Sequence, residues 1–300
     1  MCRHRATVTL ALPDNYDRQA FLDFHRRDPQ AVAEQVDTRS CRKAFILRHH
    51  PALLTVDFAP SGTVNLTLEC DSVDVSEELP LSSLAEHWLG LSQPCAEFEQ
   101  RASNHPQAGP LIRAQAGLRV PQSATPFEAL SWAIIGQQIS VAAAVSIRRR
   151  FILKADHQHT CGLYCYPDPE AVQTLDMAAL RDCGLSRSKA ECLLTVARAC
   201  RQQALLPEPG LSEPQLAALR ARLLAIRGLG PWSVHYALLR GYAYMDGSLH
   251  GDVAVRRGIQ RLQQMPAPPT AREADVWLSE FRPWRSLMAA HLWQSVSVNA

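Results

Sequence analysis

Hydrophobic and polar residues alternate in the first part of the chain. Apolar side chains stand at every second position in V-x-L-x-L at 8–12, L-x-V-x-F at 54–58 and V-x-L-x-L at 64–68. This period of two is typical of antiparallel strands that bury one face. Residues 41–49 are a further strand candidate, and residues 15–27 predict a helix between the first strands. We therefore expect an α+β unit built on an antiparallel sheet.

After about residue 80 the apolar spacing becomes that of helices. Thr125 is followed by Pro126 at the first helical position and by Glu128 three residues after the cap, which predicts a capping box. Ser212 and Gln215 repeat this signal before another apolar stripe. This part of the chain is predicted to be all-α, with further helices at 186–203, 253–263, 271–280 and 284–295.

Composition and charge narrow the class of protein. The chain has 300 residues, of which 47% are hydrophobic, and no apolar run approaches the about 18 residues of a membrane span. Nine cysteines without a C-x-x-C pair favour reduced thiols, so we expect a cytoplasmic protein with no membrane partner. Residues 1–118 carry 11 basic and 15 acidic side chains, whereas residues 119–300 carry 20 and 14. The basic second part favours a polyanionic partner, although a mixed solvated surface remains an alternative.

The segment HQHTCGLYC brings His157, His159, Cys161 and Cys165 close together in the sequence. A zinc site is one interpretation, but this spacing matches no common zinc pattern. We expect an ordinary loop.

The segment AIRGLGPW at 225–232 predicts a tight turn between two helices. Gly228 stands where the first helix is expected to end, in the left-handed conformation that glycine favours. Gly230 is expected to cap the second helix, with Pro231 at its first position. The free amides there are suited to a phosphate, and the carbonyls of Leu224, Ile226 and Leu229 to a small cation. A plain helical hairpin is the alternative.

Asp252 and a group of aromatic residues are the other candidate site residues. Asp252 begins a predicted helix, where aspartate is also a common N-cap without further function. Trp232 and Tyr236 are four residues apart and share a helix face, and Trp293 lies in the last predicted helix. Such aromatics often belong to a core, but a pocket of indoles beside a carboxylate would suit a flat cationic ligand.

Taken together, these segments resemble the helix-hairpin-helix DNA glycosylases, and within them the AlkA-type 3-methyladenine DNA glycosylase II. The matching segments, in the order of that family, are PFEALSWAIIGQQIS, CYPDPE, GLSRSKAECLL, RGLGPWSVHYALLRGY, HGDVAVRRGI and PWRSLMAAHLW. The resemblance implies an α+β antiparallel-sheet accessory domain at 1–95 and an all-α catalytic region at 96–300. That region would have one lobe at 118–240, ending in the hairpin, and a second lobe made of 96–117 and 241–300.

The resemblance also implies roles for individual residues. Asp252 falls on the catalytic aspartate of the family, and Gln138 on the loop that enters the duplex. The implied base-pocket residues are Trp232, Tyr236, Trp293 and Gln137. The implied DNA-binding positions of the hairpin are Gly228, Gly230, Ser233 and Val234.

The implied activity is removal of alkylated, cationic bases such as 3-methyladenine from double-stranded DNA, by a monomer that needs no cofactor beyond a possible monovalent cation. Relatives that also cut the strand use a lysine where this chain has Trp232, and none of Lys43, Lys154 and Lys189 is expected near the hairpin. Relatives with an iron–sulfur cluster carry four cysteines after the aspartate, whereas the last cysteine here is Cys200. The alternatives are a non-catalytic helix-hairpin-helix DNA-binding module and a bifunctional glycosylase/lyase for oxidised bases.

Overall fold

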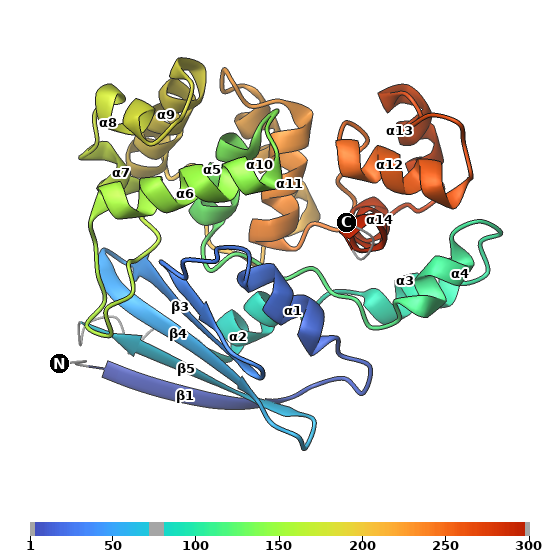
Figure 1. Ribbon diagram of the computed structural model, residues 1–300, viewed down its shortest axis with the longest axis horizontal. Helices are drawn as coiled ribbons and strands as arrows, with labels where there is room; N and C mark the ends of the chain where they lie inside the picture. Colours follow the sequence, from blue (N-terminus) through green and yellow to red (C-terminus); the bar gives the residue numbers. More distant parts are fainter. Residues whose placement is uncertain (1–3, 72–80, 298–300) are drawn as a thin grey trace.

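The computed structural model describes residues 4–71 and 81–297. A β-sheet lies at one end of the molecule, and the helices that follow it in sequence gather over one end of the sheet and beside it (Figure 1). Among the described residues, no helix combines the length and the apolar character needed to cross a membrane.

The sheet contains five antiparallel strands in the order β1-β5-β4-β3-β2. Val8 and Val56 both lie opposite Leu66, so the alternating apolar residues of three strands share one face. The four predicted strands are confirmed, but β2 was missed because a three-residue strand shows no alternation. The strands are β1 (His4–Ala11), β2 (Glu34–Val36), β3 (Ser40–Leu47), β4 (His50–Phe58) and β5 (Thr63–Cys70).

Two helices, α1 (Arg18–His25) and α2 (Leu81–Leu89), pack on the apolar face of the sheet. The ring of Phe21 in α1 lies 5.7 Å from that of Phe58 in β4 and 5.2 Å from that of Trp88 in α2, measured between ring centroids. Burial of these three aromatic side chains helps to hold α1 and α2 on the sheet. A fully buried phenylalanine contributes roughly 1.5–3 kcal/mol.

The segment that holds the histidine and cysteine cluster covers part of the opposite face. Tyr166 pairs with β3 through hydrogen bonds of 3.0 Å to Ala44 and to Ile46, and Cys165 packs with Leu53. No group of three potential metal ligands occurs among residues 4–71 and 81–297. Through the hydrogen bonds of Tyr166 and the packing of Cys165, the segment attaches the connection between two helices to the sheet.

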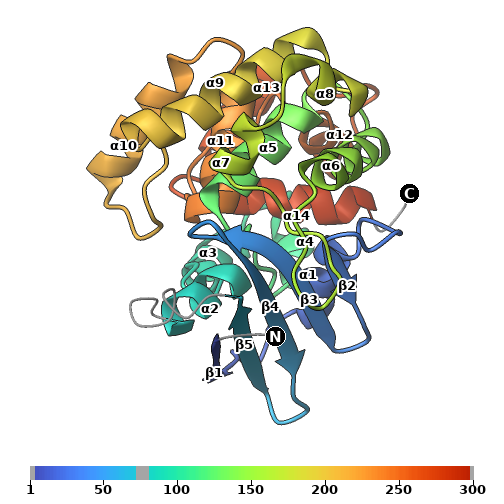
Figure 2. The same cartoon turned by 90° about the vertical axis from the view of Figure 1, so that its left-hand side faces the viewer.

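The rest of the chain forms twelve helices within the described residues. Figure 2 shows α5 to α11 above the sheet, with α12 and α13 overlapping them in this view, whereas Figure 1 shows α12 to α14 to one side of them. The helices are α3 (Cys95–Ala102), α4 (Gly109–Ala114), α5 (Pro126–Gly136), α6 (Val141–Ala155), α7 (Pro169–Gln173), α8 (Met177–Asp182), α9 (Arg187–Gln203), α10 (Glu213–Leu224), α11 (Pro231–Tyr242), α12 (Val253–Leu262), α13 (Ala271–Ser279) and α14 (Arg285–Ser297).

Two hydrophobic clusters account for this arrangement. The larger one runs without interruption from the sheet into α5, α6, α9, α10 and one face of α11. The second joins α3 and α4 to α12, α13 and α14, and reaches the other face of α11. Helix α11 is thus shared by both clusters, which places its side chains at the junction between the two helical groups. The domain boundaries given above stay a prediction.

A buried ion-pair network joins the sheet to α5 and α6. Lys43 of β3 is 1% exposed, and its Nζ lies 2.6 Å from Glu34 Oε1 and 2.5 Å from Glu128 Oε1. Burial opposes the charge on Lys43, but the carboxylates of Glu128 and Glu34 outweigh it and raise the lysine pKa. Arg148 of α6 contacts the same two carboxylates. The network therefore satisfies its buried charges internally, as burial requires.

The capping box predicted at Thr125 and Glu128 forms only in part. Thr125 accepts a hydrogen bond from the Glu128 amide at 3.1 Å, so the first half of the capping box is present. The Glu128 carboxylate, however, accepts from the Ala124 amide and pairs with Lys43. At the other predicted capping box, Gln215 Oε1 accepts from the Ser212 amide at 2.8 Å and also from the Ser212 hydroxyl at 2.8 Å.

Candidate active site

The turn between α10 and α11 has the two glycines in different conformations. Gly228 has a φ of +97°, the left-handed value expected for it. The helix α10 nevertheless ends earlier than predicted, at Leu224, so Gly228 lies within the turn and not at the helix end. A Cβ at Gly228 would be 3.1 Å from Cβ and Sγ of Cys192 in α9. Conformation and close packing therefore both favour glycine at this position.

Gly230 caps α11 in an extended conformation, followed by Pro231 as predicted. A Cβ built at Gly230 would meet no protein atom within 4 Å, so the approach to the first amides of α11 is open. The side chain of Ser233 is buried, and the Val234 amide already donates to the Gly230 carbonyl at 3.1 Å. The open amides are thus those before Val234, where a helix start leaves its donors without intrahelical partners.

The loop between α5 and α6 lies directly beside this turn. Gln137 Nε2 donates to the carbonyl of Gly228 at 2.9 Å and to Ser233 Oγ at 2.8 Å. Its amide is therefore directed at the hairpin, and a place for it in the base pocket stays a prediction. Gln138 is exposed and has a φ of +56°, so it projects from a tight turn.

Three aromatic residues predicted as pocket walls lie together. The ring centroids of Trp232 and Tyr236 are 5.5 Å apart, and those of Tyr236 and Trp293 are 6.0 Å apart. Trp232 and Tyr236 are one turn apart on α11, whereas Trp293 comes from α14. Each ring is tilted relative to its neighbour, by 30° in the first pair and 54° in the second.

Asp252 lies against the same cluster. It caps α12, with Oδ1 accepting from the amides of Ala254 at 2.8 Å and Val255 at 3.0 Å. In addition, Trp232 Nε1 donates to Oδ2 at 2.8 Å and Trp293 Nε1 donates to Oδ1 at 3.2 Å. The two predicted pocket walls therefore hold the predicted catalytic carboxylate. Its N-cap contacts and its place in the site occur together, so the two interpretations do not exclude each other.

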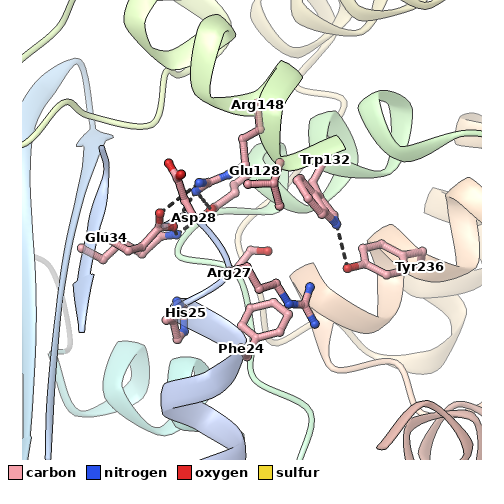
Figure 3. A pocket seen from close by; sticks show the side chains of 12 residues that line it. Phe24, His25, Arg27, Asp28, Glu34, Glu128, Trp132, Arg148 and Tyr236 are labelled. Atoms are coloured by element: carbon pink, nitrogen blue, oxygen red, sulfur yellow. Dashed lines mark hydrogen bonds and ion pairs between the residues drawn. The ribbon is translucent and has the colours of Figure 1, made fainter. Parts of the chain in front are cut away.

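A pocket lies between this cluster and α1 of the sheet part of the chain. Figure 3 shows Trp132 and Tyr236 on one side and Phe24, Arg27 and Asp28 facing them. Sequence reasoning missed this wall, because nothing near Phe24 in the sequence indicates contact with residues more than two hundred positions away. The buried ion pairs Glu34–Lys43 and Glu128–Arg148 complete the pocket.

Arg240 is a second residue that sequence reasoning missed. It is 5% exposed, and its Nη1 donates to the Pro121 carbonyl at 2.8 Å. Its Cζ lies 4.2 Å from the ring centroid of Phe24, 5.8 Å from that of Tyr236 and 5.6 Å from that of Trp293. Because Arg240 follows Tyr236 by four residues, the helical period alone could have placed it on this face.

Lys189 of α9 is held by a backbone contact to α5, and the expectation that no lysine lies near the hairpin stays a prediction. Its Nζ donates to the Ile135 carbonyl at 2.9 Å, next to Gly136, where a Cβ would be 3.8 Å from the indole of Trp232. Burial lowers the pKa of Lys189 from its ordinary value. The amine is engaged with a backbone carbonyl of α5.

Comparison with known proteins gives consistent matches. The sequence model of the family described as HhH-GPD superfamily base excision DNA repair protein matches residues 131–283. A DNA-3-methyladenine glycosylase of Bacillus subtilis (strain 168) is 25% identical over 296 residues, covering 96% of each chain. DNA-3-methyladenine glycosylase 2 of Escherichia coli (strain K12) is 31% identical over 188 residues, covering 62% of this chain and 63% of that protein.

Solved structures show the same fold. A 3-methyladenine DNA-glycosylase from Archaeoglobus fulgidus has a TM-score of 0.81 at 20% identity, covering 98% of this chain and 99% of that one. The 3-methyladenine DNA glycosylase Mag1 of Schizosaccharomyces pombe, solved with abasic DNA, has a TM-score of 0.57 at 26% identity, covering 67% of this chain and 97% of that one. The predicted fold, an antiparallel-sheet domain followed by an all-α helix-hairpin-helix region, is confirmed.

Proposed function

The chain belongs to the HhH-GPD superfamily of base excision DNA repair proteins, and we propose that it is a monofunctional DNA glycosylase that removes alkylated bases from double-stranded DNA. One observation carries the proposal. The Asp252 carboxylate is held by the N–H groups of two indoles, Trp232 and Trp293, in an aromatic cluster that includes Tyr236 and begins at the hairpin. A carboxylate in this place repels DNA and is of no use to a module that only binds it.

The chemistry follows from these groups. The target nucleotide must leave the helical stack before its sugar–base bond can be reached. A ring-methylated purine carries a positive charge, which the aromatic faces of Trp232, Tyr236 and Trp293 favour. It departs as a neutral molecule, so no acid is needed. Asp252 then stabilises the positive charge that develops on the sugar and orients the attacking water.

The hairpin is proposed to hold the DNA backbone. A phosphate can approach the amides at the start of α11, because Gly230 leaves the space in front of them open. The carbonyl of Leu224 lies in the last turn of α10, where carbonyls have no intrahelical partner. With the carbonyls of Ile226 and Leu229, it would suit a monovalent cation that bridges to the same phosphate.

A monofunctional reaction fits the groups present. Trp232 occupies the position where strand-cutting relatives are expected to carry a lysine, and Lys189 is held by the Ile135 carbonyl. Hydrolysis of a cationic base needs no redox or metal cofactor, and no iron–sulfur cluster is proposed. We further propose that the protein acts as a monomer in the cytoplasm, associated with the nucleoid if the source is bacterial.

The proposal is tested by incubating the protein with methylated duplex DNA and identifying the released bases by mass spectrometry. Release of 3-methyladenine is expected. Borohydride added during the reaction should trap no covalent protein–DNA adduct, because a hydrolytic mechanism forms no Schiff base. Absence of any released base would contradict the glycosylase assignment, and a trapped adduct would contradict the monofunctional one.

The two hairpin glycines give a matched pair of variants. Gly228→Ala is expected to lower the free energy of unfolding by about 1–2 kcal/mol, because alanine disfavours a φ of +97°. Gly230→Ala should cost less than about 1 kcal/mol but weaken DNA binding about 10-fold, since its Cβ would shield the amides from the phosphate. Thermal unfolding and DNA titration check both. A Gly230→Ala protein with unchanged DNA affinity would contradict the phosphate role.

A further inference from the structure

The hydroxyl of Tyr236 is positioned to donate a hydrogen bond into the pocket. Trp132 Nε1 donates to Tyr236 Oη at 2.9 Å, and both side chains line the pocket (Figure 3). A phenol oxygen can accept a hydrogen bond and also has one proton to donate. The Tyr236 oxygen accepts its hydrogen bond from Trp132, and no acceptor among the described residues binds the hydroxyl proton. That proton is therefore free for a ligand.

Arg240 adds a positive charge close to the ring of the same tyrosine. It lies one turn after Tyr236 on α11, its Cζ is 5.8 Å from the centre of the Tyr236 ring, and its Nε has no partner among the described residues. Burial lowers the pKa of Arg240 to about 10, so it remains charged at neutral pH. Charge acts more strongly where water is excluded. The indole N–H of Trp132 and the guanidinium of Arg240 are both donors, so neither of these neighbours can accept the Tyr236 proton.

A hydrogen-bond donor in this pocket should affect the release of neutral bases and of cationic bases differently. When the bond between C1′ and the base nitrogen breaks, its electron pair goes to the base. A methylated cation becomes neutral, whereas a neutral oxo-purine such as hypoxanthine becomes an anion. Water then supplies hydroxide to C1′ and a proton to that anion, which balances the reaction. A hydrogen-bond donor that faces the departing base stabilises the anion as it forms, and contributes little when the base leaves uncharged.

We propose that Tyr236 is the residue that determines how well this site releases neutral bases relative to cationic ones, by donating its hydroxyl proton to the departing base. Trp132 and Arg240 are positioning residues that act through it. The inference rests on the proposed function, because it assigns the base to this pocket. The rings of Trp232 and Trp293 flank Tyr236 and also bind Asp252, so donor and carboxylate are fixed relative to each other.

Tyr236→Phe tests the proposal, because it removes the hydroxyl and keeps the ring. Single-turnover rates are measured on two duplexes, one with 3-methyladenine and one with hypoxanthine. The rate on hypoxanthine is expected to fall about 10- to 100-fold, and by clearly more than the rate on 3-methyladenine, so that the ratio of the two rates falls. Tyr242→Phe is the matched control on α11, since its hydroxyl donates to the Pro207 carbonyl outside the pocket. It should leave the ratio of the two rates unchanged.

Trp132→Phe separates a positioning role from a structural one. It should lower the hypoxanthine rate less than Tyr236→Phe does. Because Trp132 acts through Tyr236, adding it to Tyr236→Phe should cause no further loss in the ratio. Equal losses on both substrates in Tyr236→Phe would overturn the proposal. Release of 3-methyladenine but no hypoxanthine by the wild type would also overturn it and leave the proposed function intact, whereas release of neither base contradicts the proposed function itself.

Discussion

Asp252→Asn is expected to lower single-turnover release of 3-methyladenine by about 10²- to 10³-fold, the usual loss when a group that stabilises transition-state charge is removed. The variant keeps the size and shape of the side chain but not its negative charge. Without that charge, the positive charge on the sugar is no longer stabilised. Base release from methylated duplex DNA, compared with wild type, measures the effect.

The fold and DNA binding should survive this change. Asparagine is as good an N-cap as aspartate, so the contacts to the amides of Ala254 and Val255 can persist. Loss of a negative charge beside the DNA should, if anything, strengthen affinity for the duplex. A variant that folds, binds DNA and still releases base at the wild-type rate would contradict the role assigned to Asp252.

Trp232→Phe is the companion variant at this contact. It keeps an aromatic ring and removes the N–H that donates to Asp252 Oδ2 at 2.8 Å. A smaller loss of rate than in Asp252→Asn is expected, since the carboxylate would stay charged but be less well oriented. A loss larger than that of Asp252→Asn would show that the indole contributes more than orientation.

Lys43→Met is expected to lower the free energy of unfolding at pH 7 by about 3–5 kcal/mol, the usual result of leaving buried charges without their partner. Glu34 and Glu128 would remain in the interior, with only Arg148 to compensate both. Urea denaturation compares the variant with wild type. Removal of the exposed pair between Arg187 and Glu191, by Arg187→Ala, is the control and should cost less than about 1 kcal/mol.

The pH dependence gives this prediction a second check. Burial opposes the charge of Glu34, but Arg148 and Lys43 outweigh it and hold the pKa below its ordinary value of 4.5. Such a carboxyl stabilises the fold above its unfolded pKa, and this contribution falls as the pH drops below about 4.5. Without Lys43 the buried carboxyl of Glu34 binds a proton more readily, so the stability gap to wild type should narrow between pH 7 and pH 5. A gap that widens would contradict the network described here.

Local signals in the sequence predicted the residues that act within one turn or helix. Gly230 and Pro231 at a helix start, Asp252 as a cap, and Trp232 with Tyr236 on one face all depend on neighbours a few positions away. The period of helices and the chemistry of caps are sufficient for such features. That Trp232 and Trp293 both bind Asp252 was not predicted, because it depends on how α14 packs against α11.

Contacts between distant segments could not be predicted in this way. The sequence motif around Thr125 indicates a capping box, yet Glu128 turns to Lys43 of β3 because a buried lysine needs a counter-charge more than a helix start needs a second cap. Phe24 reaches the pocket for a similar reason, since α1 is placed by its packing on the sheet. The contact of Lys189 with the Ile135 carbonyl was likewise not predicted, because it depends on how α9 packs against α5.

The wall that α1 adds to the pocket bears on which part of the chain determines substrate specificity. Phe24 and Arg27 belong to the sheet part of the chain, while Tyr236 and Trp132 belong to the helical part. The two parts also share one hydrophobic cluster and the buried pairs of Lys43. Under the proposed function, preference for one damaged base over another is therefore a joint property of both parts. A helical region grafted onto a different sheet domain would then carry the proposed catalytic aspartate with it, but not its choice of substrate.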